Sequence, residues 1–185
     1  LTKAVAEVRH FLQTDRTIIY RFNLDWSGFV SVESVGENWR SVRGITIKNS
    51  YFQNSYPSAY EQGRTVAVDD IYKADLSECH INLLAQFQVR ANLVVPIVQG
   101  EKLWGLLIAH ECNGPRHWQE IEVECLQQIS VQLAIAIQQS TLFEQAQIEI
   151  ADRKQAELAL QESEARERSK ALELEAAINK LRTTQ

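Results

Sequence analysis

A cysteine and a histidine stand next to each other at positions 79 and 80, at the start of a stretch with helical character. Ser77 is a suitable N-cap, and Glu78 suits the positive end of a helix dipole. Apolar residues then recur at roughly helical spacing, at Ile81, Leu83, Leu84 and Phe87. We therefore predict a short helix from about residue 76 that carries a thiol and an imidazole in its first turn, where a helix dipole favours the reactive thiolate.

Neighbouring residues of a helix point about 100° apart. Cys79 and His80 therefore fit poorly as a nucleophile and its general base, because those two groups must hydrogen-bond to each other. They fit well as two separate contacts to one extended ligand, a covalent tether and a polar floor. Composition alone favours a plainer interpretation, in which the free cysteine is a small apolar core residue and the histidine a hydrogen-bonded surface residue.

The helices and strands predicted around Cys79 and His80 indicate an α/β fold with an antiparallel sheet. A helix is expected over residues 1–13, with Val5, Val8, Phe11 and Leu12 on one side. β-Branched and aromatic runs predict strands at 17–23, 29–35, 65–68, 93–98 and 103–110, with loop at 36–50, a short helix within 51–62 and a hairpin loop at 99–102. In the second strand, Val30 and Val32 share a face. We expect the terminal helices to cover one side of the sheet and irregular connections to enclose a pocket on the other.

From residue 116 to the end there is no glycine and no proline. Residues 118–149 predict a helix with one apolar face on the sheet. The last 35 residues hold seven acids and seven bases, and some of their apolar residues fit one coiled-coil register, namely Leu160, Ala171, Leu174, Ile178 and Leu181. We therefore predict a domain over 1–149 and a helical linker over 150–185 that forms a homodimer, with a solvated single helix as the alternative.

Composition excludes several classes of function. The net charge is -5, and no cluster of Lys and Arg marks a nucleic-acid surface. We expect no membrane span, because no apolar run is long enough to cross a bilayer. Three cysteines without short paired spacing suit a reducing cytoplasm better than a disulfide framework. Because the chain contains no methionine, we interpret it as a fragment of a longer protein.

Two segments, DIYKADLSECHINLL and ANLVVPIVQGEKLWGLLIAHECNGPRHW, resemble the bilin-binding GAF domains of cyanobacteriochromes, which are relatives of the phytochromes. The segment RTIIYRFNLDWSGFVSVES adds to the resemblance, which covers about residues 1–145. It implies a GAF fold and a linear tetrapyrrole, phycocyanobilin or biliverdin, joined by a thioether from Cys79 to ring A, with His80 against the central pyrrole rings. It also implies a photoreceptor, in which isomerisation at the C15=C16 bond signals through the terminal helices to an output module such as a histidine kinase.

The resemblance assigns roles to further residues. His110 stands where phytochromes have a histidine that donates to the ring D carbonyl, and where many cyanobacteriochromes have a tyrosine. Asn49 replaces the aspartate of red/green members and Tyr51 the second cysteine of another subgroup. We therefore expect no second linkage at Tyr51, and a photocycle that is longer in wavelength or otherwise atypical. Aromatic candidates for the pocket wall are Phe52, Tyr56, Tyr60 and Tyr72, and candidates for pairing with the two propionates are Arg64 and Lys73.

Other functions stay open at this point. A GAF-type module for a diffusible ligand such as a cyclic nucleotide would make Cys79 incidental, although the sequence shows no basic or glycine-rich phosphate cradle. A metal or redox sensor could use zinc-type ligands, namely Cys79, His80, His110 and Cys112, but their spacing matches no standard zinc pattern. We expect no enzyme activity, because no nucleophile, base and orienting group emerge as a set.

Overall fold

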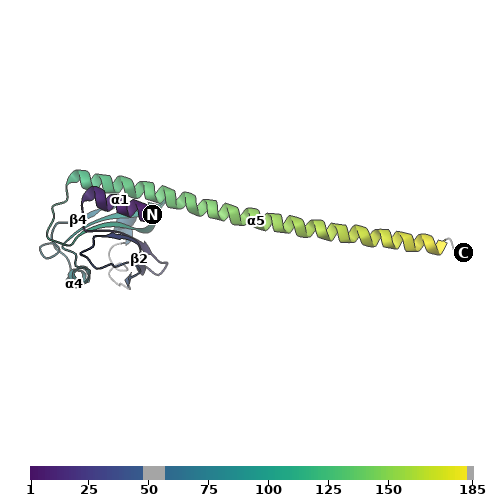
Figure 1. The fold of residues 1–185 in the computed structure, drawn as a ribbon, viewed down its shortest axis with the longest axis horizontal. Helices are drawn as coiled ribbons and strands as arrows, with labels where there is room; N and C mark the ends of the chain where they lie inside the picture. Colours follow the sequence, from purple (N-terminus) through teal and green to yellow (C-terminus); the bar gives the residue numbers. More distant parts are fainter. Residues whose placement is uncertain (48–56, 183–185) are drawn as a thin grey trace. The chain divides into compact units, whose positions relative to one another are not determined.

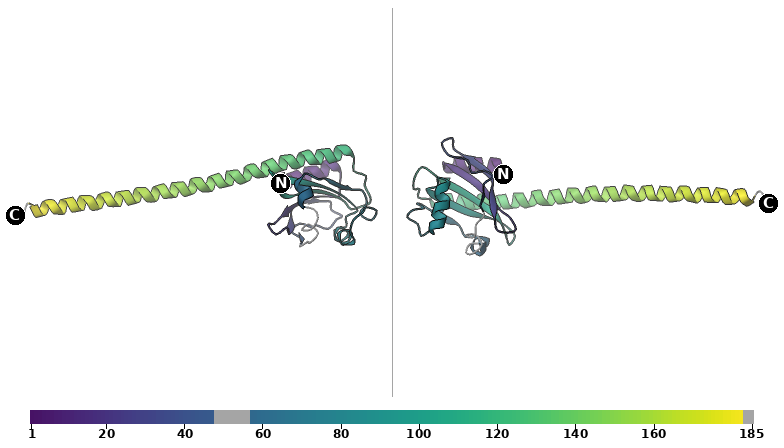
Figure 2. Two further views of the ribbon diagram at one scale, coloured as in Figure 1. Left: turned by 180° about the vertical axis from the view of Figure 1, so that it is seen from behind. Right: turned by 90° about the horizontal axis from the view of Figure 1, so that it is seen from below.

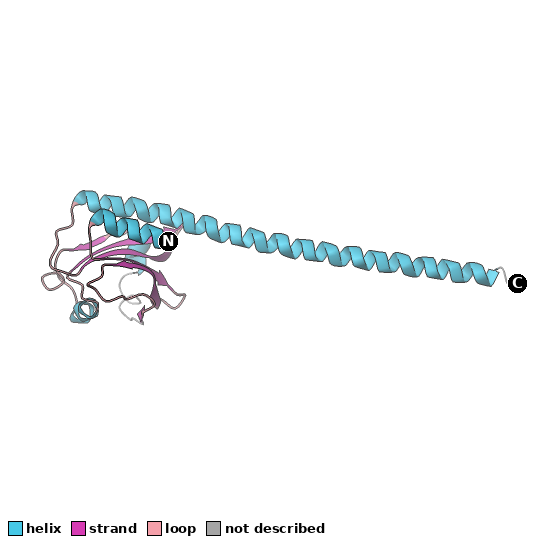
Figure 3. Ribbon diagram, viewed as in Figure 1, coloured by secondary structure: helices cyan, strands magenta, loops and turns pink. Residues whose placement is uncertain are grey.

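The computed structural model describes residues 1–47 and 57–182, in which six strands form one antiparallel sheet. The elements follow in the order α1 (Thr2–Leu12), β1 (Arg16–Phe22), β2 (Gly28–Val35), β3 (Thr46–Ile47), α3 (Pro57–Glu61), β4 (Val66–Val68), α4 (Glu78–Gln86), β5 (Ala91–Gln99), β6 (Lys102–Glu111) and α5 (Glu120–Arg182) (Figure 3). The strand order across the sheet is β3-β2-β1-β6-β5-β4, so β1 pairs with β6 at its centre. The predicted mixed fold with an antiparallel sheet is confirmed, but β3 lies in the stretch 36–50 that we predict as loop.

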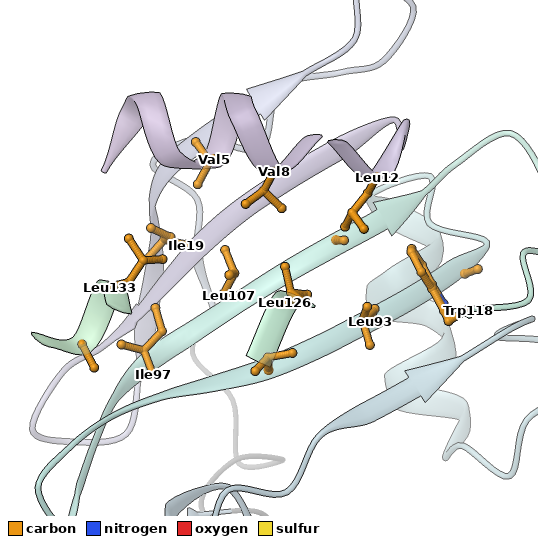
Figure 4. Packing of buried hydrophobic residues seen from close by; sticks show 14 residues of the cluster. Val5, Val8, Leu12, Ile19, Leu93, Ile97, Leu107, Trp118, Leu126 and Leu133 are labelled. Carbon is orange, nitrogen blue, oxygen red and sulfur yellow. The ribbon is translucent and has the colours of Figure 1, made fainter. Parts of the chain in front are cut away.

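Helix α1 and the first turns of α5 cover one face of the sheet, and α4 lies on the other side (Figures 1 and 2). Val5, Val8 and Leu12 of α1 are buried against the strands together with Leu126 of α5 (Figure 4). Phe11 is 60% exposed, so the prediction that it shares the buried side of α1 is wrong. It lies about 100° around the helix from Leu12, which turns it toward solvent.

A β-bulge in β2 changes the face of the sheet to which some of its side chains point. Ile19 pairs with Val32 and Tyr20 pairs with Val30, which leaves Ser31 without a partner of its own in β1. Val32 therefore packs against the α1 side of the sheet, whereas Val30 belongs to the cluster on the opposite side. The prediction that the two valines share a face is wrong, because one extra residue reverses the alternation of a strand.

The contacts divide the chain after Gln138 into two units. The first, Leu1–Gln138, holds the whole sheet. The second is helical as far as Arg182, and it carries an ion pair of 2.6 Å between Arg153 and Glu149. Its register leucines are exposed, Leu160 by 61% and Leu174 by 66%, while the side chains of 178 and 181 lie outside the described residues. The predicted boundary at 149/150 and the coiled coil stay predictions.

No helix within the described ranges has both the length and the apolar character that a bilayer crossing requires.

Candidate functional site

A cavity of about 80 Å³ lies on the face of the sheet opposite α1 and α5. Its floor is formed by side chains of the central strands, among them Ile18, Leu106 and Ile108, and α4 forms part of its wall. Most of the lining is apolar. Three nitrogen-bearing side chains reach it from two different directions, namely His80, Asn92 and His110. The predicted pocket on this face is confirmed.

Helix α4 places His80 inside the cavity and Cys79 at its edge. The predicted cap is present, because Ser77 Oγ accepts a hydrogen bond of 3.3 Å from the backbone N–H of His80. The lining residues of this stretch share one helical face, namely Leu76, His80, Leu83, Leu84 and Phe87. Cys79 lies about 40° around the helix from Leu83, and it is exposed. The thiol is therefore at the rim, where a tether would reach an occupant of the cavity from solvent.

Three buried polar residues form one row across the sheet. Arg16 of β1 is opposite His110 of β6, and His110 is opposite Asn92 of β5. Directly opposed residues of antiparallel strands point to the same face. His110 is 3% exposed and Asn92 is 4% exposed, and within the described part of the chain neither His110 Nδ1 nor Asn92 Oδ1 has a hydrogen-bond partner. Since buried polar groups normally have one, these two atoms mark where a polar group of a ligand would bind.

Both cavity histidines are neutral in this environment. Burial, and then the charge of Arg16, lower the pKa of His110 to about 3. Burial also lowers the pKa of His80. A neutral imidazole offers one N–H donor and one acceptor nitrogen, so His110 can donate to a carbonyl without carrying a charge into the cavity.

We predict that acid destabilises the pigment-free protein through His110. The unfolded chain takes up a proton on this imidazole near pH 6.5, whereas the folded protein does so only near pH 3. Between these values the unfolded state binds more protons, so the free energy of unfolding falls as the pH falls, by up to about 1.4 kcal/mol per pH unit. Urea unfolding at several pH values in this window measures the effect.

The matched variant for this prediction is His110→Leu, which should lose most of the slope. A smaller slope of the same sign should remain from His80, because its pKa is lowered too. An unchanged slope in His110→Leu would contradict the assignment.

Sequence reasoning missed Arg16, whose side chain is fully buried beside the cavity. Its Nη1 donates to the carbonyl oxygen of Phe87 at 2.8 Å and its Nη2 to that of Arg40 at 2.7 Å. Its Nε lies 3.2 Å from the carboxylate of Glu33. Arg16 thus joins β1 to the end of α4 and to the 36–45 loop, both of which border the cavity.

Asn92 was also missed, although one signal was available. It is the single polar residue between Ala91 and Val98, in a strand that is otherwise apolar. A polar residue in a buried strand needs a hydrogen-bond partner, which marks Asn92 as a candidate for contact with a ligand.

Of the other predicted site residues, some line the cavity, some lie outside its lining and some lie outside the described residues. Tyr60 is buried and lines the cavity. Tyr72, Arg64 and Lys73 are exposed and outside its lining, and Tyr72 instead lies under the guanidinium of Arg90, 5.0 Å from ring centre to Cζ. Their proposed contacts with a ligand stay predictions. The remaining candidates lie outside the described residues, namely Asn49, Tyr51, Phe52 and Tyr56.

The zinc-type ligands do not converge. Cys112 is buried just after β6 and does not line the cavity, and burial raises the pKa of its thiol to about 11. Cys79 is exposed at the rim. Across residues 1–47 and 57–182, no group of three or more His, Cys, Asp or Glu side chains is arranged to hold a metal ion.

The residues present fit a linear tetrapyrrole in chemistry, and the cavity must enlarge to fit it in volume. The cavity is apolar, has a thiol at its rim, and holds on its floor two polar atoms that no residue of 1–47 or 57–182 pairs with. These features match a pigment with a conjugated apolar body and polar lactam ends. At about 80 Å³ the cavity holds only a few water molecules. A bound tetrapyrrole therefore needs a wider cavity than the one that the described residues enclose.

Comparison with known proteins agrees with this fold. The family model for the GAF domain matches residues 1–137. A Synechocystis protein named as a methyl-accepting chemotaxis protein is 44% identical over 152 residues, which is 82% of this chain and 15% of that protein. The chain thus spans less than a sixth of that relative.

Two solved structures show the same architecture. The blue-light absorbing form of the PixJ GAF domain of Thermosynechococcus elongatus is 41% identical with a TM-score of 0.75, covering 78% of this chain and 86% of that one. The far-red absorbing dark state of JSC1_58120g3, with bound biliverdin IXa, is 36% identical with a TM-score of 0.71, covering 74% and 86%. The chain therefore belongs to the GAF domain family, with its strong structural matches among the cyanobacteriochrome GAF domains.

Proposed function

We propose that this domain is a photosensor that binds a linear tetrapyrrole covalently through Cys79. The observation that carries the proposal is the exposed thiol at the rim of an apolar cavity whose floor holds two polar atoms without a hydrogen-bond partner among the described residues. A relative of the same fold holds biliverdin IXa, which supports a pigment of this class and suits the longer-wavelength photocycle expected from Asn49.

The reaction of Cys79 with the pigment is the addition of its thiol to a double bond, without oxidation or reduction. The sulfur attacks the exocyclic double bond of ring A, a C–S bond forms, and the thiol proton ends on the neighbouring carbon. The bound pigment supplies visible absorption and reversible isomerisation about its C15=C16 bond. The protein supplies the tether, an apolar wall that excludes water, and neutral imidazoles from His80 and His110 as polar contacts.

A set of hydrogen bonds and ion pairs around Arg116 supports transmission of a structural change from the cavity to the terminal helices. Glu111 follows His110 in β6, and its carboxylate lies 3.0 Å from the guanidinium of Arg116. The same guanidinium lies 2.6 Å from Glu122 in the first turn of α5. It also donates to the carbonyl oxygen of Leu12, the last residue of α1, at 2.6 Å. A shift at His110 would therefore act on both helices, and we infer that the charged second unit passes it on as a dimer to an output module such as a histidine kinase.

We expect the protein to become coloured when it is produced together with enzymes that make phycocyanobilin or biliverdin. The purified protein should absorb visible light, convert reversibly between two spectral forms on illumination, and show zinc-induced fluorescence on a denaturing gel. These three readouts test binding, isomerisation and covalent linkage separately. Protein that stays colourless with either pigment would overturn the proposal.

A further inference from the structure

The side-chain amide of Asn92 includes an acceptor oxygen, Oδ1, that no described residue pairs with. Its side chain faces the cavity from β5 and is 4% exposed, and its Oδ1 accepts no hydrogen bond within the described part of the chain. Leaving a buried acceptor unpaired destabilises the folded state. An apolar residue of the same shape would avoid this cost, so the amide is better explained by a ligand than by the stability of the pigment-free fold.

The position of Asn92 indicates which kind of ligand group its side chain can bind. It is directly opposite His110 in the β5–β6 ladder, and both side chains line the cavity. The Cβ atoms of such a pair are about 5 Å apart, so the two side chains can converge on one small group. His110 can donate from its neutral ring, and Asn92 can accept. Together they present one donor and one acceptor to the cavity.

A lactam ring is complementary to this pair, because it carries a carbonyl acceptor next to an N–H donor. We propose that Asn92 is a second polar anchor for ring D, with Oδ1 accepting from the lactam N–H while His110 donates to the lactam carbonyl. This inference rests on the proposed tetrapyrrole function and deepens it. Since ring D is the ring that turns in the photoreaction, the Asn92 contact is made in one photostate and broken in the other.

The first arm of the test uses the pigment-free protein. Asn92→Leu keeps the branching of the side chain and removes the unpaired acceptor, so the urea midpoint should stay unchanged or rise. Thr17→Val is the matched control. Thr17 is fully buried on the opposite, α1 side of the sheet, and its Oγ1 also lacks a hydrogen bond among the described residues. A clear fall in the midpoint of Asn92→Leu alone would show a structural partner for Asn92 and overturn the inference.

The second arm uses protein loaded with ¹⁵N-labelled phycocyanobilin or biliverdin. In Asn92→Leu, the proton resonance of the ring D N–H should move upfield in one photostate, because its acceptor is gone, while the other three N–H resonances and the Thr17→Val spectrum stay as in the unmodified protein. Ring D resonances equal to those of the unmodified protein in both photostates would overturn the inference. Failure of the unmodified protein to take up pigment would instead overturn the proposed function, and the first arm would still report on Asn92.

Discussion

Cys79→Ala is expected to abolish covalent pigment attachment while leaving the protein folded. The thiol is exposed at the rim of the cavity, so its replacement by alanine should change the free energy of unfolding by no more than about 0.5 kcal/mol. Pigment can still enter the cavity of this variant and give colour in the native state. It should be lost completely on a denaturing gel, where zinc-induced fluorescence measures the thioether.

Cys125→Ala is the control for that experiment, because it removes a half-buried thiol of α5 that does not line the cavity. This variant should keep full zinc-induced fluorescence. Fluorescence that persists in Cys79→Ala and disappears in Cys125→Ala would transfer the linkage to the other cysteine and contradict the assignment of the site.

Arg16→Leu is expected to destabilise the pigment-free protein by about 3–5 kcal/mol, the usual effect of breaking a buried ion pair. The variant leaves the carboxylate of Glu33 buried without its cation and removes donors from the carbonyl oxygens of Phe87 and Arg40. Because those two acceptors belong to the end of α4 and to the loop beside it, the cavity wall should loosen as well. Urea unfolding measures the first effect and hydrogen exchange of the α4 amides the second.

Two further variants separate the ion pair from the loss of an arginine as such. Arg21→Leu changes an exposed arginine of the same strand and should alter the free energy of unfolding by less than about 1 kcal/mol. Adding Glu33→Leu to Arg16→Leu should recover part of the loss, because the buried charge then disappears. A double variant that is less stable than the sum of both single variants would contradict this explanation.

The local elements of the site could be predicted because their determinants are close together in the chain. Ser77 caps α4 through the backbone of His80, three residues on, and the apolar spacing of the helix selects its cavity face. The β-branched runs predict strands at 93–98 and 103–110, so they place His110 on a strand, whereas Asn92 precedes the predicted start of β5. The resemblance to bilin-binding GAF domains makes Cys79, His80 and His110 the candidates for contact with the pigment.

Some features depend on pairing between strands that are distant in the sequence, and local sequence patterns do not specify that pairing. The bulge at Ser31 turns Val30 and Val32 to opposite faces, which strict alternation cannot show. Tyr72 is exposed and lies against Arg90, a residue on the far side of α4 in the chain. The row Arg16, His110 and Asn92 exists only once β1, β6 and β5 lie side by side.

The sequence by itself determined the mixed fold with an antiparallel sheet and the helix that presents the thiol, because these follow from periodicity and capping. The class of ligand followed from the resemblance of the segments around Cys79 and His80 to bilin-binding GAF domains. Only the tertiary structure decided which polar atoms meet in the cavity and which of them are left without a partner. Hydrogen bonding inside a protein depends on distances between strands, and those distances are set by how the whole sheet pairs.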